Sequence, residues 1–315
     1  MEEKSILFIV VPCYNEEEVL PETIKRLNDK IITLIRDNKI SDDSRVLFVD
    51  DGSKDNTWDL IEKTHQSSKY FAGVKLSRNF GHQNALLAGL SVAKEKCDIS
   101  ISMDADLQDD INAIDKMVDE YHNGYEIVYG VRSSRKKDTV LKKTTAEGFY
   151  KLMKKMGADV VFNHADYRLL SKVALERLFE FNETNLFIRG IVPRIGYKST
   201  TVEYERNERF AGESKYPFKK SLALAVDGIT SFSIKPLFMI FWLGVVMAII
   251  GFVAFVSLAV LMYFFPAIGV VWPIVSALML FTGIILSVIG VVGVYVGKTY
   301  IETKHRPVFI IEKII

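Results

Sequence analysis

The chain of 315 residues exceeds one average domain and carries a formal net charge of only +1. Nucleic-acid-binding proteins normally have a clearly basic surface, so this balance argues against a nucleic-acid partner. Charge is unevenly distributed, because residues 236–297 contain no Asp, Glu, Lys, Arg or His. We expect no signal peptide, since the first apolar run, Ile6–Val11, is too short for one. These features predict a charged cytoplasmic domain followed by a membrane anchor.

The first half of the chain alternates between short apolar runs and amphipathic segments. Strands are predicted at residues 6–11, 45–49, 73–76, 99–103 and 126–129. Helices are predicted between them, beginning near Glu16, near Asp55 or Thr57, and after Gln83, with a further helix through residues 114–121. This alternation is typical of a doubly wound, mostly parallel α/β sheet. Such sheets bind ligands beyond the carboxyl ends of their strands.

The fourth predicted strand runs directly into an acidic cluster. Four carboxylates and one amide fall within seven residues: Asp104, Asp106, Gln108, Asp109 and Asp110. Oxygen ligands of this kind suit Mg²⁺ or Mn²⁺, which proteins usually bind through few carboxylates plus substrate phosphates. The alternative is a solvated acidic loop. The apolar strand that leads into the cluster favours a divalent-cation site at the sheet edge.

Several other kinds of site are absent from the sequence. No Gly-x-Gly-x-x-Gly turn follows the first strand and no Walker P-loop occurs, which argues against nicotinamide and P-loop nucleotide sites. The five His residues show no paired spacing, so a zinc site is not expected. Cys13 and Cys97 also lack metal-ligand spacing. We expect them to be buried, reduced thiols rather than a disulfide.

The uncharged region contains two predicted membrane spans. Residues 237–265 exceed the roughly 20 residues that cross a bilayer, and residues 273–297 form a second span after a Pro- and Gly-containing break. Two core helices of a soluble protein are the alternative, but such helices are not normally uncharged on every side. Basic residues flank only the outer ends of this hairpin, which predicts that both termini are cytoplasmic. Residues 217–235 have apolar residues at helical spacing and predict an interfacial helix, with a packing helix of the soluble domain as the alternative.

Six motifs spread along the chain occur together: VVPCYNEEE at 10–18, VDDGSKD at 49–55, SRNFGHQNALLAG at 77–89, MDADLQD at 103–109, ADYRLLS at 165–171 and RFAGESKY at 209–216. With them, essentially the whole chain resembles glycosyltransferase family 2, in particular the polyprenyl-phosphate glycosyltransferases. The resemblance implies a GT-A-type cytosolic domain at residues 1–216. It further implies an interfacial helix at 217–235, two membrane helices within 236–297 and a cytosolic tail at 298–315.

The resemblance also implies roles for individual residues. The positions that match a nucleotide-sugar site are Pro12, Tyr14, Glu16, Val49, Asp51, Asp104 and Ala105, with Asp51 accepting a hydrogen bond from the base. The positions that match a metal site are Asp106, Gln108 and Asp104. The positions that match acceptor-phosphate contacts are Arg132, Arg209 and Lys215. Asp166 matches an acidic position near the acceptor, and it joins Asp104, Asp106 and Arg132 as a catalytic candidate.

The implied reaction is an inverting transfer of a sugar from a UDP-sugar to undecaprenyl phosphate at the plasma membrane. Glucose is the first expectation and N-acetylglucosamine the second. The alternatives are mannosyl transfer from GDP-mannose and, from another class of protein, a non-catalytic nucleotide-sugar-binding membrane scaffold. Processive synthesis is not expected, because no Gln-x-x-Arg-Trp motif occurs. The resemblance further implies a homo-oligomer, such as a tetramer.

Overall fold

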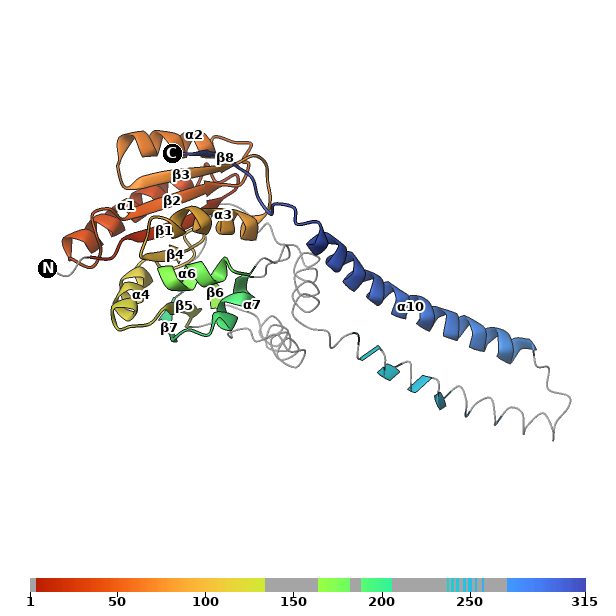
Figure 1. Ribbon diagram of the computed structural model, residues 1–315. Helices are drawn as coiled ribbons and strands as arrows, with labels where there is room; N and C mark the ends of the chain where they lie inside the picture. The colour runs from red at the N-terminus through yellow and green to blue at the C-terminus, as the bar shows by residue number, and fades with distance from the viewer. Residues whose placement is uncertain are drawn as a thin grey trace.

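The computed structural model describes residues 4–133, 164–181, 188–205 and 271–315, together with isolated positions between 237 and 257. Its centre is an eight-stranded sheet with the strand order β7-β5-β6-β4-β1-β2-β3-β8 (Figure 1). The strands are β1 Leu7–Cys13, β2 Arg45–Asp50, β3 Phe71–Leu76, β4 Ile99–Ser102, β5 Ile127–Arg132, β6 His164–Ser171, β7 Ser199–Tyr204 and β8 Ile311–Ile314. The five predicted strands are therefore confirmed, with ends that differ by a few residues.

Strand direction makes this a mixed sheet. The four strands β4, β1, β2 and β3 are mutually parallel, which confirms the predicted parallel core. Strand β6 runs antiparallel to both of its neighbours, β4 and β5, and β8 runs antiparallel to β3. Because β6 is reversed, its first residues lie at the edge where β1, β2 and β4 end.

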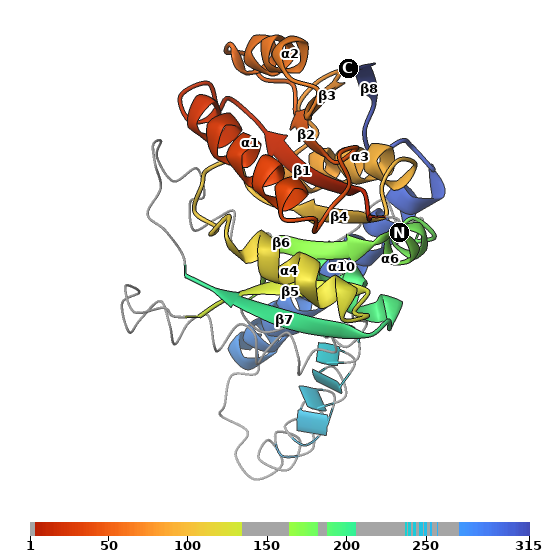
Figure 2. The ribbon, with the colours of Figure 1, turned by 90° about the vertical axis from the view of Figure 1, so that its left-hand side faces the viewer.

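Helices cover both faces of the sheet (Figure 2). Apolar side chains of α1, α2 and α4 pack on one face, and those of α3, α6 and α7 pack on the other. The helices are α1 Leu20–Arg36, α2 Thr57–Ser67, α3 His82–Lys94, α4 Ala113–His122, α6 Lys172–Leu178, α7 Ile188–Ile191 and α10 Val271–Thr303, with a 3₁₀ turn at Val192–Ile195. Helix α1 begins at Leu20 rather than near Glu16, with Pro21 in its first turn, where a missing N–H breaks no helical hydrogen bond.

The C-terminal residues return to the sheet. After α10, which projects away from the sheet, β8 pairs with the edge strand β3 (Figure 1). Gly73 and Ile315 exchange backbone hydrogen bonds of 3.0 and 2.9 Å, and Lys313 Nζ lies 2.6 Å from Glu62 Oε1. The sequence pattern predicts only a cytosolic tail at these residues, so this strand is an addition to the predicted fold.

The predicted membrane region is only partly described. The span at 273–297 falls within α10, whereas most of the span at 237–265 and all of the interfacial segment at 217–235 lie outside the described residues. In the described part of the chain, no helix meets the length and apolarity needed to cross a bilayer. Cys13 and Cys97 are buried and unpaired, as the sequence predicts.

Candidate active site

The loops that follow β1 and β2 are joined at the sheet edge. Asp51 N donates to Cys13 O at 2.9 Å, and Asn15 N donates to Ser53 Oγ at 3.0 Å. In the strands below, Pro12 and Val49 are direct partners in the β1–β2 register, and the loop carries Tyr14 and Glu16 next to them. The predicted nucleotide positions therefore form one continuous stretch of the edge.

Asp51 fixes the start of helix α3. Its Oδ1 accepts a hydrogen bond from Phe80 N at 2.7 Å and its Oδ2 accepts one from Gly81 N at 3.0 Å. Burial raises the pKa of Asp51, although these two hydrogen bonds act in the opposite direction. This arrangement carries the following residue, His82, to the sheet edge. The predicted contact of Asp51 with a nucleotide base stays a prediction.

The acidic loop after β4 has a tightly held backbone. Thr23 Oγ1 donates to Ala105 O at 2.9 Å, and Gln108 N donates to Asp106 Oδ1 at 3.2 Å. Leu107 is buried and has a φ of 57°, a conformation that non-glycine residues seldom adopt. Packing and hydrogen bonds therefore hold the loop in a shape that the backbone alone would not favour.

Carboxylates crowd around Asp104. Burial raises its pKa to about 6; His82 opposes this shift, while Asp109, Asp166 and Asp106 add to it. Mutual repulsion of this kind is relieved when a cation binds between the carboxylates. The oxygen donors at this edge therefore fit a hard divalent ion.

The described part of the protein supplies few ligands of its own to such an ion. Among the described residues, no three His, Cys, Asp or Glu side chains converge as a metal-binding group. The predicted ligands Asp104, Asp106 and Gln108 lie in one loop and comprise two carboxylates and an amide. That set matches the incomplete Mg²⁺ or Mn²⁺ sites that substrate phosphates complete.

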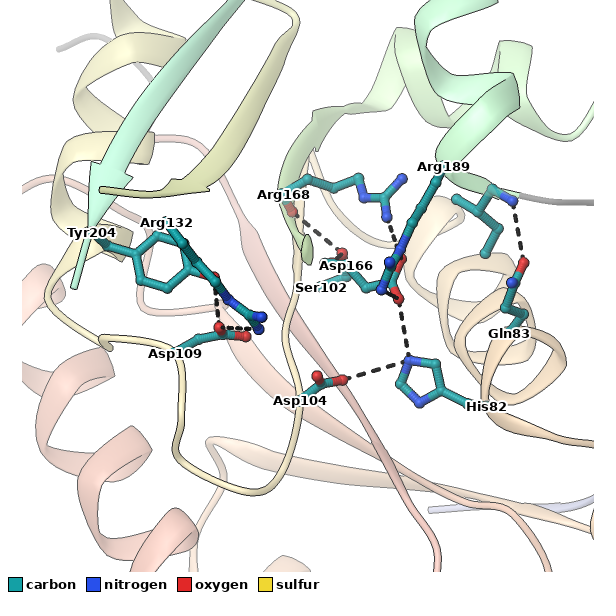
Figure 3. Close-up of polar contacts among 11 residues, drawn as sticks. His82, Gln83, Ser102, Asp104, Asp109, Arg132, Asp166, Arg168, Arg189 and Tyr204 are labelled. Atoms are coloured by element: carbon teal, nitrogen blue, oxygen red, sulfur yellow. Dashed lines mark hydrogen bonds and ion pairs between the residues drawn. The ribbon is translucent and has the colours of Figure 1, made fainter. Parts of the chain in front are cut away.

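Asp166 is surrounded by cations (Figure 3). Arg189 contacts it with two hydrogen bonds, from Nε to Oδ1 at 3.0 Å and from Nη2 to Oδ2 at 2.7 Å. Arg168 Nη2 donates to Oδ1 at 2.5 Å. His82 Nε2 lies 3.6 Å from Asp166 Oδ2 and 3.5 Å from Asp104 Oδ1, so it links the two carboxylates.

These contacts determine the charge of the cluster that Asp166 forms with Arg168, Arg189 and His82. Burial raises the pKa of Asp166, but Arg189, His82 and Arg168 outweigh it and hold the pKa well below its usual range. Burial lowers the pKa of His82, but Asp166 and Asp104 outweigh it and raise the pKa to about 9. Asp166 is consequently an ionised group and a poor proton acceptor at neutral pH.

Arg132 lies at the end of β5 and contacts Asp109 of the acidic loop after β4 (Figure 3). Its Nη2 lies 3.3 Å from Asp109 Oδ1, and Tyr204 Oη donates to that oxygen at 2.6 Å. Burial raises the pKa of Asp109 despite these partners, and its Oδ2 is buried with no hydrogen-bond partner among the residues that the structure describes. A cavity of about 670 Å³ lies on the α1 side of Asp109 and includes neither Asp104 nor Asp106.

The structure thus brings most of the predicted site residues to one edge of the sheet. Arg209 and Lys215 lie outside the described residues. Three basic residues of the site were not predicted: His82, Arg168 and Arg189. His82 and Arg168 lie within two of the quoted motifs, which was the available signal, whereas Arg189 lies in none of them.

Comparison with other proteins identifies the class. Residues 8–179 match the family model described as glycosyl transferase family 2. The chain belongs to this family and is a glycosyltransferase. It is 49% identical over 98% of its length to the uncharacterized glycosyltransferase YkoT of Bacillus subtilis, covering 91% of that protein. It is 38% identical over 97% of its length to the prophage bactoprenol glucosyl transferase homolog of Escherichia coli, covering 98% of that protein. It is also 38% identical over 96% of its length to the bactoprenol glucosyl transferase of Shigella phage SfV, covering 97% of it.

Similarity to solved structures is more distant. Glucosyl-3-phosphoglycerate synthase from Mycobacterium tuberculosis, solved with Mn²⁺ and UDP, aligns with a TM-score of 0.45 and 17% identity, covering 72% of this chain and 78% of that one. The assignment to the family therefore rests on the sequence matches.

Proposed function

We propose that this glycosyltransferase moves glucose from UDP-glucose to a polyprenyl phosphate such as undecaprenyl phosphate, giving polyprenyl-phosphate glucose and UDP. One observation carries the proposal: the similarity to bactoprenol glucosyl transferases extends over nearly the whole of both chains. The arrangement of the sheet edge supports it, because positions suited to a nucleotide, a cation and an anionic acceptor follow one another along that edge.

The donor would lie across the ends of β1, β2 and β4. Tyr14, Glu16 and Asp51, with Pro12 and Val49 beneath them, hold the nucleotide. Asp104 and Ala105 lie at the sugar diphosphate. Asp106 and Gln108, with Asp104, would hold a Mg²⁺ or Mn²⁺ ion, which neutralises the charge that develops on the departing diphosphate.

The acceptor phosphate is already anionic at neutral pH, so its attack needs no strong general base. In the proposed step one phosphate oxygen forms a bond to the anomeric carbon while the bond from that carbon to the diphosphate oxygen breaks, with inversion. Arg132, Arg209 and Lys215 are proposed to bring the two anions together. Asp166, which holds its proton poorly, would orient the basic residues around it rather than accept a proton.

A lipid acceptor requires that the site lie close to a membrane. Two observations support a two-helix anchor: residues 236–297 carry no charge, and α10 exposes large apolar side chains such as Leu278, Ile285 and Ile289. We therefore place the catalytic domain and both termini at the cytoplasmic face of the plasma membrane. A homo-oligomer assembled through the membrane helices is part of the same proposal.

The test is transfer of radiolabelled sugar by the purified full-length protein. UDP-glucose, UDP-N-acetylglucosamine, UDP-galactose and GDP-mannose are each offered with undecaprenyl phosphate. UDP-glucose should label the lipid fastest. Faster labelling from GDP-mannose would show that GDP-mannose, not UDP-glucose, is the donor. UDP binding without transfer from any donor would indicate a non-catalytic scaffold.

Variants of the acidic loop test the role of the cation. Asp104→Asn and Asp106→Asn should lower transfer by at least about a hundredfold, since neutralisation of the leaving group supplies several kcal/mol. Asp59→Asn, at an exposed position on α2, is the matched control and should behave as wild type. Equal labelling by the two loop variants and wild type would contradict the metal site.

A further inference from the structure

The cluster around Asp166 holds more positive charge than its carboxylate balances. Two arginines, Arg168 and Arg189, contact this single carboxylate from different elements, β6 and α7. Guanidinium groups stay charged at every accessible pH. Even without His82, the group of three side chains therefore carries one surplus positive charge.

Arg168 is incompletely paired among the described residues. Its side chain is only 1% exposed, and its Nε and Nη1 are buried with no hydrogen-bond partner in the described part of the chain. Buried charge is costly unless it is paired and hydrogen-bonded. A buried guanidinium with two unbonded nitrogens favours an anion close to it, and Arg168 lies beside the same carboxylate as Arg189.

Arg189 is the arginine of the cluster that a ligand can reach. Its side chain is 33% exposed, whereas those of Asp166 and Arg168 are nearly fully buried. It contacts Asp166 through Nε and Nη2, which is one edge of the guanidinium plane. Ile188 N also donates to Gln83 Oε1 at 3.3 Å, which ties the start of α7 to α3 (Figure 3). The position of this side chain is thus fixed before a ligand binds.

The sheet order indicates which phosphate Arg189 faces. The proposed nucleotide positions lie on β1 and β2 or in the loops directly after them, the acidic loop follows β4, and Asp166 lies on β6, the next strand along. The cluster therefore lies on the side of Asp104 that is remote from the nucleotide positions. That is the side from which an acceptor would approach the sugar.

We infer that Arg189, oriented by Asp166 and backed by the charge of Arg168, binds the phosphate of the lipid acceptor. This inference rests on the proposed function and adds an acceptor contact to it. Arginine suits this role, because its planar group forms paired, charge-assisted hydrogen bonds with phosphate oxygens. The donor diphosphate offers the same chemistry, so the test separates the two sources.

Binding measured without turnover tests the inference. Titration calorimetry on the full-length protein in detergent compares a short-chain prenyl phosphate with the corresponding prenyl alcohol, and measures UDP separately. Arg189→Ala should weaken binding of the prenyl phosphate by at least about tenfold, the effect of losing a charged hydrogen bond, and leave the alcohol unaffected. Arg189→Lys should recover part of the loss. Arg177→Ala, on the exposed face of α6, is the control and should bind as wild type.

Three outcomes would overturn the assignment of Arg189 to the acceptor phosphate. Unchanged prenyl phosphate binding by Arg189→Ala overturns it. A tenfold loss of UDP affinity with unchanged prenyl phosphate binding assigns Arg189 to the donor and also overturns it. If Arg189→Ala does not fold, as judged by circular dichroism, unchanged phosphate binding by Arg189→Lys overturns it. Wild type that binds prenyl phosphate through Arg189 but transfers no glucose would leave the inference standing and refute the proposed function.

Discussion

Removal of the Asp166 carboxylate tests whether the cluster depends on its central charge. With respect to the described residues, Asp166→Ala leaves the fully buried Arg168 without an anionic partner, since Nη2 would lose its hydrogen bond to the Asp166 carboxylate. Breaking a buried ion pair by removing one partner typically costs about 3–5 kcal/mol. Arg189 adds little to this figure, because one third of its side chain is exposed and water screens its charge. We expect Asp166→Ala to lower the free energy of unfolding by about 3–5 kcal/mol.

A paired substitution separates this effect from loss of packing. Asp166→Leu combined with Arg168→Met removes both charges and keeps apolar volume, so it should recover most of the stability. The assay is urea unfolding of the full-length protein in detergent, followed by intrinsic fluorescence, with Asp59→Asn as the control. A loss below about 1 kcal/mol for Asp166→Ala, or a double variant less stable than the single one, would refute the reasoning.

Three further outcomes follow from single positions. Gly52 has a φ of 66°, and a Cβ there would lie 2.4 Å from the Arg78 carbonyl carbon, so Gly52→Ala should lose at least about 1–3 kcal/mol in thermal unfolding. The pKa of Asp166 is lowered in the folded state, so its ionised form stabilises the protein above about pH 4. The stability gap between wild type and Asp166→Asn should therefore narrow as pH falls below about 4, and an unchanged gap down to pH 2 would contradict this. Burial raises the pKa of Cys97 to about 12, so a thiol reagent at about pH 8 should leave it unmodified until the protein unfolds. Modification of Cys97 before the protein unfolds would contradict its burial in the folded state.

Much of the parallel core is readable from the sequence because each signal is local. Continuous apolar runs such as Leu7–Cys13 mark strands that are buried on both faces, and polar clusters directly after them mark the binding edge. The MDADLQD motif is predicted at this edge for that reason, and the structure places it directly after β4.

The parts that escaped prediction depend on long-range pairing. Strand β8 pairs with β3 across more than two hundred residues of sequence, so no local sequence pattern predicts this pairing. Arg189 reaches Asp166 from a four-residue helix that has no motif of its own. In the sequence His82 is an isolated histidine, since its carboxylate partners Asp104 and Asp166 come from the loop after β4 and from β6.

Strand direction and register are what assemble the charges of the site. If β6 ran parallel to β4, its first residues would lie at the opposite end of the four-residue β4, on the order of 10 Å from the acidic loop. The antiparallel pairing instead places Arg168 directly opposite Ser102, and Ser102 Oγ donates to Asp166 O at 2.5 Å. A shift of one residue in this register would turn Arg168 and Asp166 to the other face of the sheet, away from His82 and Arg189. The positive cluster therefore exists because one reversed strand is locked in register beside the strand that carries the acidic loop.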